Sequence, residues 1–356
     1  RTGERLRGYV LLYFEDGAIR WNKDHLNDTP VSPPGHSNTD WRNYGFRSSF
    51  DAAFGRLTAT AALDVWSEGG ETRNIPEATG VRVWGYSGRF ATLAPYAGLR
   101  YAQPLGEEWT VTPSLGARYY HSSEFDDAWA PCAALTAERG GLQLFVSHAR
   151  GVHYPGIYVR GTSPRTWRGL DAETLDTTEA GVRLEVGSLA ALHASLYRAA
   201  VRNRMETTAA GLLNTGDATS DGGELTARLY PTKSLTLFAG AAYAHPRTRP
   251  VSRMPDLTFS AGASVRLTRH LRWDADCEYV ATQYAYSMRT PEPVLQKLDD
   301  FFVLNTRLAL DLQTVSSLHG ELSLALENLG DTTYAYFPGY PMPGLLAYAG
   351  VKVRFW

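Results

Sequence analysis

Hydrophobic and polar positions alternate with a period of two along most of the chain, and the C-terminal segment shows this most clearly. From Ala347 to Phe355 every odd-numbered residue is apolar, whereas the even-numbered residues include Lys352 and Arg354. Such alternation is typical of a β-strand. An apolar face that continues to an aromatic residue near the C-terminus indicates a strand with one face against lipid and the other against water.

The same alternation recurs upstream, in residues 257–267, 271–281, 307–312 and 318–327. No apolar run reaches the length of about 18 residues that a membrane-spanning helix needs. The pattern therefore predicts an all-β fold, a transmembrane antiparallel β-barrel that forms a single domain over residues 1–356.

The connections between the predicted strands differ in length, and short turns alternate with long polar segments. Bacterial barrels have short periplasmic turns and long outer loops. This sorting predicts about sixteen strands, and it assigns the weak alternation of Val81–Tyr86 to an outer loop. The expected outer loops are 17–40, 68–89, 151–173, 204–221, 246–255, 286–299 and 331–342.

Composition supports this interpretation and excludes other classes. The formal net charge is -2, so the clustered basic charge needed for nucleic-acid binding is missing. The chain contains 20 Tyr, 13 Phe and 9 Trp, as expected for aromatic girdles at the two membrane interfaces. Cys132 falls on an expected inward position and Cys277 on an expected lipid-facing one, so we expect no disulfide between them.

Candidate catalytic groups are scarce. Asp274, Asp276 and Glu278 share the polar face of one strand, and we interpret them as a hydrated charge ladder balanced by Arg272, Arg266 and Lys352 rather than as paired catalytic acids. No arrangement of Ser, His and acid typical of a barrel hydrolase is present. We therefore predict neither an enzyme nor a cofactor.

Several short motifs resemble the TonB-dependent outer-membrane receptors. Glu327–Tyr334 (ENLGDTTY), Tyr340–Gly344 (YPMPG) and the terminal Phe355–Trp356 resemble the end of that family, and Tyr154–Gly156 with Leu170–Gly181 resembles its mid-barrel signature. The resemblance covers residues 90–356 well and 1–89 loosely. It implies a barrel of 22 strands preceded by a plug domain and a TonB-contacting box. We identify no candidate plug domain in this sequence, so the sixteen strands are expected to be part of such a barrel or a reduced form of it.

The resemblance implies a receptor in the bacterial outer membrane that takes up a scarce nutrient, most simply a ferric-siderophore-type chelate, with energy supplied through TonB. The expected partners are the lipid membrane, the outer-membrane assembly machinery, TonB through a plug, and a small-molecule or metal-chelate ligand. Three alternatives stay open: a passive porin-like channel, a copper-ion receptor, and a barrel subunit that another protein chain completes or fills.

The candidate site residues lie in the predicted outer loops. Aromatic and cationic side chains there suit an anionic, flat ferric chelate by stacking and charge attraction. All four Met residues also fall in outer loops, and thioethers with imidazoles such as His25 and His36 are soft ligands suited to copper, although no metal site is firmly defined. For ligand binding we select His153, Tyr154, Tyr158, Arg160, Met205, Met254, Tyr286, Met288, Arg289 and Phe337, and for the barrel-assembly signal Val351, Val353 and Phe355.

Overall fold

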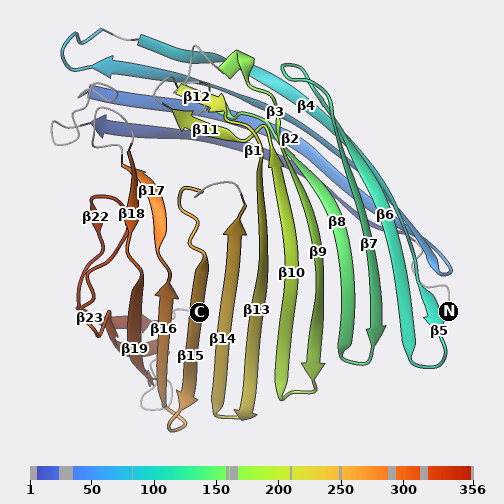
Figure 1. The fold of residues 1–356 in the computed structure, drawn as a ribbon, viewed down its shortest axis with the longest axis vertical. Coiled ribbons are helices and arrows are strands. Elements are labelled where there is room, and N and C mark those ends of the chain that lie inside the picture. The colour runs from blue at the N-terminus through green and yellow to red at the C-terminus, as the bar shows by residue number, and fades with distance from the viewer. Residues whose placement is uncertain are drawn as a thin grey trace.

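The computed structural model describes residues 6–23, 35–81, 83–157, 160, 167–208, 211–247, 251–287, 294–312 and 320–353. Figure 1 shows that these residues form one large antiparallel sheet with small hairpins at its upper end. In this described part, no helix is long and apolar enough to cross a membrane.

Each strand of the main sheet pairs with the next one along the chain, apart from the small hairpins described below. Because β4 and β5 both pair with β6 as one interrupted strand, the sheet contains sixteen strands, which confirms the predicted number. The strands are β1 (Leu6–Lys23), β2 (Gly35–Phe54), β3 (Leu57–Pro76), β4 (Val83–Tyr101), β5 (Gln103–Leu105), β6 (Trp109–Ser122), β7 (Ala128–Arg139), β8 (Leu142–His153), β9 (Glu173–Val186), β10 (Ala190–Arg202), β13 (Ala218–Thr232), β14 (Leu235–Pro246), β15 (Leu257–Arg266), β16 (Leu271–Val280), β19 (Phe301–Asp311), β20 (Gly320–Glu327) and β23 (Leu346–Val353).

In the described residues, the longer connections contain three complete hairpins and a short 3-10 helix. They are β11 (Met205–Thr208) with β12 (Gly211–Asn214), β17 (Gln283–Ser287) with β18 (Val294–Leu298), β21 (Ala335–Phe337) with β22 (Tyr340–Pro341), and the 3-10 helix η2 (Trp167–Gly169). Short turns close the opposite edge of the wall. At Gly55, Gly140 and Gly187 a positive φ lets the chain reverse within a few residues.

The prediction of outer loops at 17–40 and 68–89 was wrong. The β1–β2 ladder continues to the pair Lys23↔Gly35, and the β3–β4 ladder continues to Asn74↔Val83, so most of Val81–Tyr86 belongs to a strand. Beyond the lipid both faces of a strand can be polar, so the hydrophobic alternation ends there. The backbone hydrogen bonds do not depend on that alternation and extend the hairpins well past the membrane.

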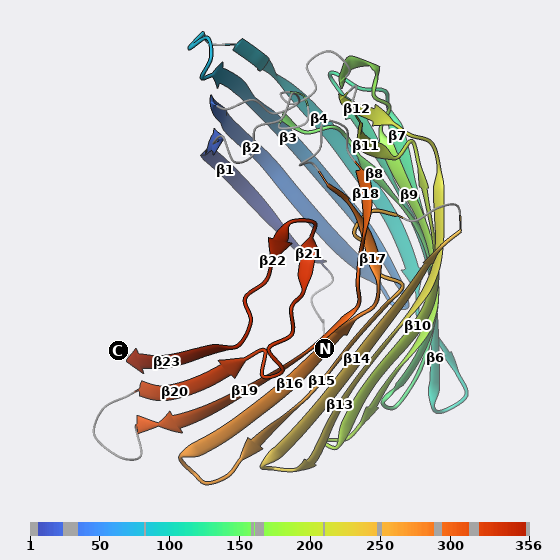
Figure 2. The same cartoon turned by 60° about the vertical axis from the view of Figure 1, so that its left-hand side comes forward.

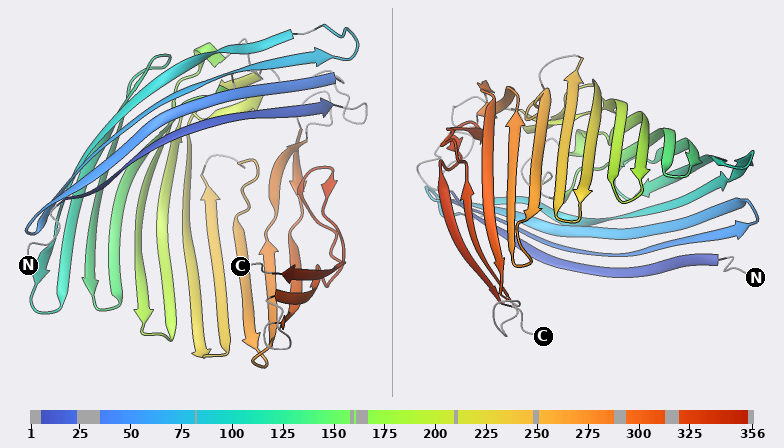
Figure 3. Two further views of the ribbon diagram at one scale, coloured as in Figure 1. Left: turned by 180° about the vertical axis from the view of Figure 1, so that it is seen from behind. Right: turned by 90° about the horizontal axis from the view of Figure 1, so that it is seen from below.

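The wall is curved but open. Among the described residues no pairing joins β1 to β23, and Figures 2 and 3 show these two strands at the free edges of the sheet. The predicted antiparallel barrel wall of sixteen strands is confirmed. Of the two forms that the sequence left open, the open wall in the described part corresponds to part of a larger barrel rather than to a reduced, closed one.

Register and alternation define the outward, lipid-facing side of this wall. Leu196, Leu324 and Val351 point outward with exposed fractions of 73%, 54% and 70%, and Val353 shares that face. Their partners across the sheet are also apolar or small, as in Leu324↔Ala349 and Leu322↔Val351. Side chains exposed to this extent are suited to contact with lipid. Phe355, the third residue of the predicted assembly signal, lies outside the described residues.

Aromatic side chains mark the borders of the outward apolar band on several strands. Tyr119 of β6 packs against Trp129 of β7, with ring centroids 4.9 Å apart. Tyr279 and Phe302, a directly opposed pair on β16 and β19, occupy the corresponding outward positions there. Such girdles form where aromatic rings sit at the level of the lipid headgroups. The prediction of free cysteines is also confirmed, and Cys277 pairs across the sheet with outward Leu304.

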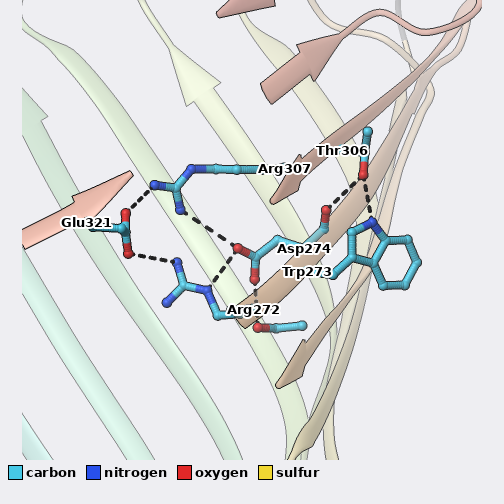
Figure 4. A network of polar contacts seen from close by, with 7 residues as sticks. Arg272, Trp273, Asp274, Thr306, Arg307 and Glu321 are labelled. Carbon is cyan, nitrogen blue, oxygen red and sulfur yellow. Dashed lines mark hydrogen bonds and ion pairs between the residues drawn. The ribbon is translucent and has the colours of Figure 1, made fainter. Parts of the chain in front are cut away.

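Charged side chains on the inward side of β16, β19 and β20 form a network of ion pairs and hydrogen bonds (Figure 4). The Asp274 carboxylate accepts hydrogen bonds from Arg272 Nε at 3.0 Å and Ser264 Oγ at 2.7 Å, and lies 3.8 Å from Arg307 Nη1. Glu321 pairs with Arg307 and lies 3.9 Å from Arg272 Nη2. Two arginines and two carboxylates therefore neutralise each other across three strands. Asp274 and Arg272 of the predicted ladder take part in this network, whereas Asp276 accepts a hydrogen bond from Asn305 and Glu278 accepts one from Tyr336.

Candidate ligand site at the outer mouth

The connection between β20 and β23 folds back onto the inward side of the wall. Tyr334 packs against Phe301, with ring centroids 4.5 Å apart, and Phe301 is buried with Val280 and Val303. Figure 2 shows β21 and β22 projecting from the end of the last strands over the concave side. This packing places β21, including Phe337, at the outer mouth.

Asn328 holds the two ends of this connection together. Its amide donates to Thr332 O at 2.9 Å and to Pro343 O at 3.2 Å, and its side-chain oxygen accepts from Thr332 N at 2.9 Å. Asn328 is buried and has a φ of 52°, a conformation that Asn tolerates better than most residues. The ENL motif thus has a structural role, because its asparagine closes the loop that carries Phe337.

A pocket of 430 Å³ lies where four separate segments meet at this outer mouth. Met205 begins β11, Tyr286 lies in β17 and Phe337 ends β21. The Arg253 guanidinium stacks over the Phe337 ring at 4.4 Å, and Arg253 N donates to Tyr284 O at 2.7 Å. The pocket is lined by Arg204, Met205, Glu206, Val251, Ser252, Arg253, Tyr286 and Phe337.

The pocket carries a surplus of positive charge. Arg204 forms an ion pair with Glu206, and both side chains are largely buried. Arg253 has no carboxylate within ion-pair distance among the described residues, and it is exposed. Two arginines against one carboxylate, next to two aromatic rings, favour a ligand that is anionic and flat.

A second cluster surrounds Arg160, which comes from the connection between β8 and β9. The Arg160 side chain is fully buried. Its Nε donates to Pro155 O at 3.1 Å, and its Nη1 donates to the Tyr86 hydroxyl at 2.9 Å. The guanidinium also lies over four aromatic rings, those of Phe90 at 4.0 Å, Phe125 at 4.7 Å, Trp167 at 5.0 Å and Tyr86 at 5.4 Å. Arg160 therefore fixes this connection to the inward side of β4.

Two further groups from the same region support this cluster. Tyr154 stacks on Phe125 with ring centroids 5.1 Å apart, and its hydroxyl donates to Asp126 O at 3.0 Å. Burial raises the pKa of Tyr154 to about 12, so its hydroxyl stays protonated as a donor at neutral pH. Glu68 lies within the same cluster, beyond the apolar part of β3. Burial raises the pKa of Glu68, although a hydrogen bond from Ile157 N and the charge of Arg160 oppose that shift.

Raising the pH is expected to loosen the β20–β23 connection. Burial, reinforced by nearby Glu278, raises the pKa of Tyr336 to about 12 from an ordinary value of 10.0. Because the folded-state pKa is higher, the neutral hydroxyl contributes fully below pH 10, and this contribution is lost as the pH rises toward 12. Near-ultraviolet circular dichroism should show this transition, and Tyr336→Phe should reduce its amplitude. A transition of unchanged amplitude in Tyr336→Phe would contradict the assignment.

The predicted site residues divide into two groups in the structure. Met205, Tyr286 and Phe337 converge on the pocket, and Met254 follows pocket residue Arg253 directly without lining the pocket. His153 and Tyr154 lie beside the Arg160 cluster. Tyr158, Met288 and Arg289 lie outside the described residues, as does His25. The sequence interpretation missed six residues: Arg204, Arg253, Glu68, Tyr86, Phe90 and Phe125. Arg204 and Arg253 could have been selected, because both are cationic residues in predicted outer loops.

The described residues contain no group of three or more His, Cys, Asp or Glu side chains placed to hold a metal ion. Met205 is the only methionine among the described lining residues of the pocket.

A curved antiparallel wall, lipid-facing outside and lined inside by charge, with a pocket at its outer mouth, defines an outer-membrane β-barrel protein. A profile of the TonB-dependent receptor-like β-barrel family matches residues 6–329, and the chain belongs to this family. It is an outer-membrane protein of a non-enzymatic transporter family. A comparison with curated protein sequences found no match.

Solved structures of three receptors share the fold. The chain superimposes on the copper transporter OprC with a TM-score of 0.76 and 16% identity, over 99% of this chain and 64% of that one. A mutant of the ferric enterobactin receptor PfeA from Pseudomonas aeruginosa gives a TM-score of 0.72 and 16% identity, over 98% and 59%. The ferric-catecholate import receptor Fiu from E. coli K12 gives 0.69 and 12%, over 99% and 62%. The chain thus spans about 60% of the length of these proteins.

Proposed function

We propose that this protein is a receptor and transporter for an anionic aromatic metal chelate of the ferric-catecholate type, taken up across the outer membrane with energy supplied through TonB. The observation that carries the proposal is the stacking of Arg253 on Phe337 in a pocket with surplus positive charge. Ferric tris-catecholates combine negative charge with flat rings. A cation and an aromatic side chain in contact offer both complementary surfaces.

Family membership and two of the similar structures also support a metal chelate as the ligand. PfeA and Fiu are described as ferric enterobactin and ferric-catecholate receptors. At 16% and 12% identity these likenesses establish the fold, so the ligand assignment depends on the pocket of this chain.

Copper uptake is the second candidate, because Met205 lines the pocket and the similar OprC is described as a copper transporter. Copper(I) prefers soft thioether ligands. A single described thioether without a neighbouring imidazole or thiolate makes a weak copper site, so we place this candidate behind the chelate. The two candidates differ in which pocket residue is essential.

Equilibrium binding of iron(III) tris-catecholate to the purified full-length protein tests the proposal. Arg253→Gln and Phe337→Leu are each expected to weaken binding about tenfold, because each removes a cationic or aromatic surface that a bound chelate would cover, a contact worth roughly 1–2 kcal/mol once the ligand excludes water from it. Arg168→Gln is the matched control, because it removes an exposed outer-loop arginine that does not line the pocket. An uncharged ferric hydroxamate should bind weakly to every form.

The outcomes separate the two candidates. If Arg253→Gln binds the tris-catecholate as tightly as the parent protein, the chelate proposal is wrong. If the parent protein binds copper(I) but no chelate, and Met205→Leu abolishes that binding, the protein is a copper receptor.

A further inference from the structure

An apolar groove of 730 Å³ lies on the outward side of the wall, over β9, β10, β13 and β14. Its floor is made of small residues on adjacent strands, since Ala180 and Gly223 both oppose Leu196, and Ala194 opposes Leu225. Leu196, Leu225, Tyr243 and Leu257 form its walls. The groove therefore lies in the apolar band, on the side of the sheet where lipid is the solvent.

Gly223 is required for the shape of this groove. A Cβ atom at Gly223 would lie 2.8 Å from Leu196 Cδ2 and 3.0 Å from Ser195 O, so any larger residue would displace the leucine that forms the wall. Elsewhere in the outward band, two large side chains can oppose each other directly, as Leu308 and Leu324 do across β19 and β20. The hollow is thus a local feature of these strands.

Charged residues border the outer end of the groove. Asp221 lines the groove and accepts from Arg198 Nε at 2.7 Å, and it also pairs with Arg247. One step further along the same side, Asp176 accepts from Arg150 Nε at 2.7 Å and lies 3.9 Å from Arg202 Nη2. Four arginines thus share two carboxylates on the outward side. Arg198, Arg202 and Arg247 stay more than half exposed, at 57%, 60% and 52%.

These arginines interrupt the outer aromatic girdle. On β6, β7, β16 and β19 the outward residues at the outer border are aromatic, namely Tyr119, Trp129, Tyr279 and Phe302. On β8 to β13 the corresponding stretch carries His148, Thr178, Arg198 and Asp221, which face each other across the strands. A surplus of cations at headgroup height, directly above an apolar groove, matches a lipid that carries negative charge on its headgroup.

We propose that this surface binds a phosphorylated acyl glycolipid of the outer leaflet. One acyl chain lies in the groove between Leu196 and Tyr243, and a headgroup phosphate lies against the exposed guanidinium groups of Arg198, Arg202 and Arg247. Arginine suits this role because its planar fork donates two hydrogen bonds to a phosphate. The site is on the opposite side of the wall from the ligand pocket, so the proposal is independent of the transported ligand.

Native mass spectrometry of the full-length protein, titrated with bisphosphorylated lipid A or with the same lipid after dephosphorylation, tests this proposal. We expect the phosphorylated form to bind at least several-fold more tightly. The double variant Arg198→Gln/Arg247→Gln should weaken its binding about tenfold and leave the dephosphorylated lipid unaffected, because cations near the membrane surface each contribute to anionic-lipid affinity.

A second variant tests the groove itself. Ala194→Phe fills the floor with an apolar ring, keeps the outward side compatible with lipid, and should weaken binding of both lipid forms. Ala263→Phe, at an outward position of β15 that does not line the groove, is the matched control and should bind like the parent protein. Equal affinity for both lipids in the parent protein would overturn the proposal. Equal losses in Ala194→Phe and Ala263→Phe would overturn it as well.

Discussion

Replacing Leu324 with arginine is expected to block assembly of the protein into the membrane. Leu324 lies in the middle of β20, points outward, and faces Leu308 on one neighbouring strand and Ala349 on the other. An arginine on the lipid face near the bilayer midplane costs about 2–4 kcal/mol in a β-barrel. Because the strands of a barrel insert together, this free-energy cost opposes insertion of all the strands and not of β20 alone. Heat-modifiable mobility on gels and the amount of folded protein in outer membranes measure the effect.

Ser323→Arg provides the control on the same strand. Ser323 faces inward, opposite Gly350 and Ala309, toward the side that carries the Arg272–Asp274–Arg307–Glu321 network. The same side chain there should reach water and leave assembly near the parent level. Equal amounts of folded protein in Leu324→Arg and Ser323→Arg would show that the outward and inward faces have been assigned the wrong way round.

The outward and inward faces were predictable because lipid and water impose opposite demands on neighbouring residues. Val351, Val353 and Leu324 follow that rule, and the register of β20 and β23 confirms it. The upper parts of β1 to β4 were not predictable in this way. Beyond the lipid, residues such as Asn74 belong to strands because the backbone hydrogen bonds continue. Those bonds do not depend on side-chain hydropathy, so the hydropathy pattern could not predict them.

The candidate site was predictable in its residue types but not in its grouping. Met205, Tyr286 and Phe337 were recognised as outer-loop residues, yet they are far apart in the sequence. Their convergence depends on packing that brings the β20–β23 connection onto the wall, as in the contact of Tyr334 with Phe301. Such long-range contacts leave no periodic pattern. Arg160 shows the same limit, because the sequence suggested a ligand-facing cation and the structure buries its guanidinium among aromatic rings.

Replacing Arg160 with leucine is expected to release the connection between β8 and β9 from the wall. The change removes two hydrogen bonds from a charged donor and four cation–π contacts, while Glu68 keeps its buried carboxylate. Contacts of these kinds are worth roughly 0.5–3 kcal/mol each, and we expect a net loss of about 3 kcal/mol in the free energy of docking. Hydrogen–deuterium exchange of peptides covering Tyr154 and Trp167 should then rise about a hundredfold.

Arg168→Leu distinguishes this anchoring role from a general effect of arginine in the same connection. Arg168 also contacts the Trp167 ring, at 4.8 Å, but it is exposed, so its removal should change exchange only slightly. Loosening the connection in Arg160→Leu should also raise the accessibility of Phe90 and Phe125, which Arg160 covers from the inward side. If the two variants exchange alike, the aromatic cluster holds together without its cation.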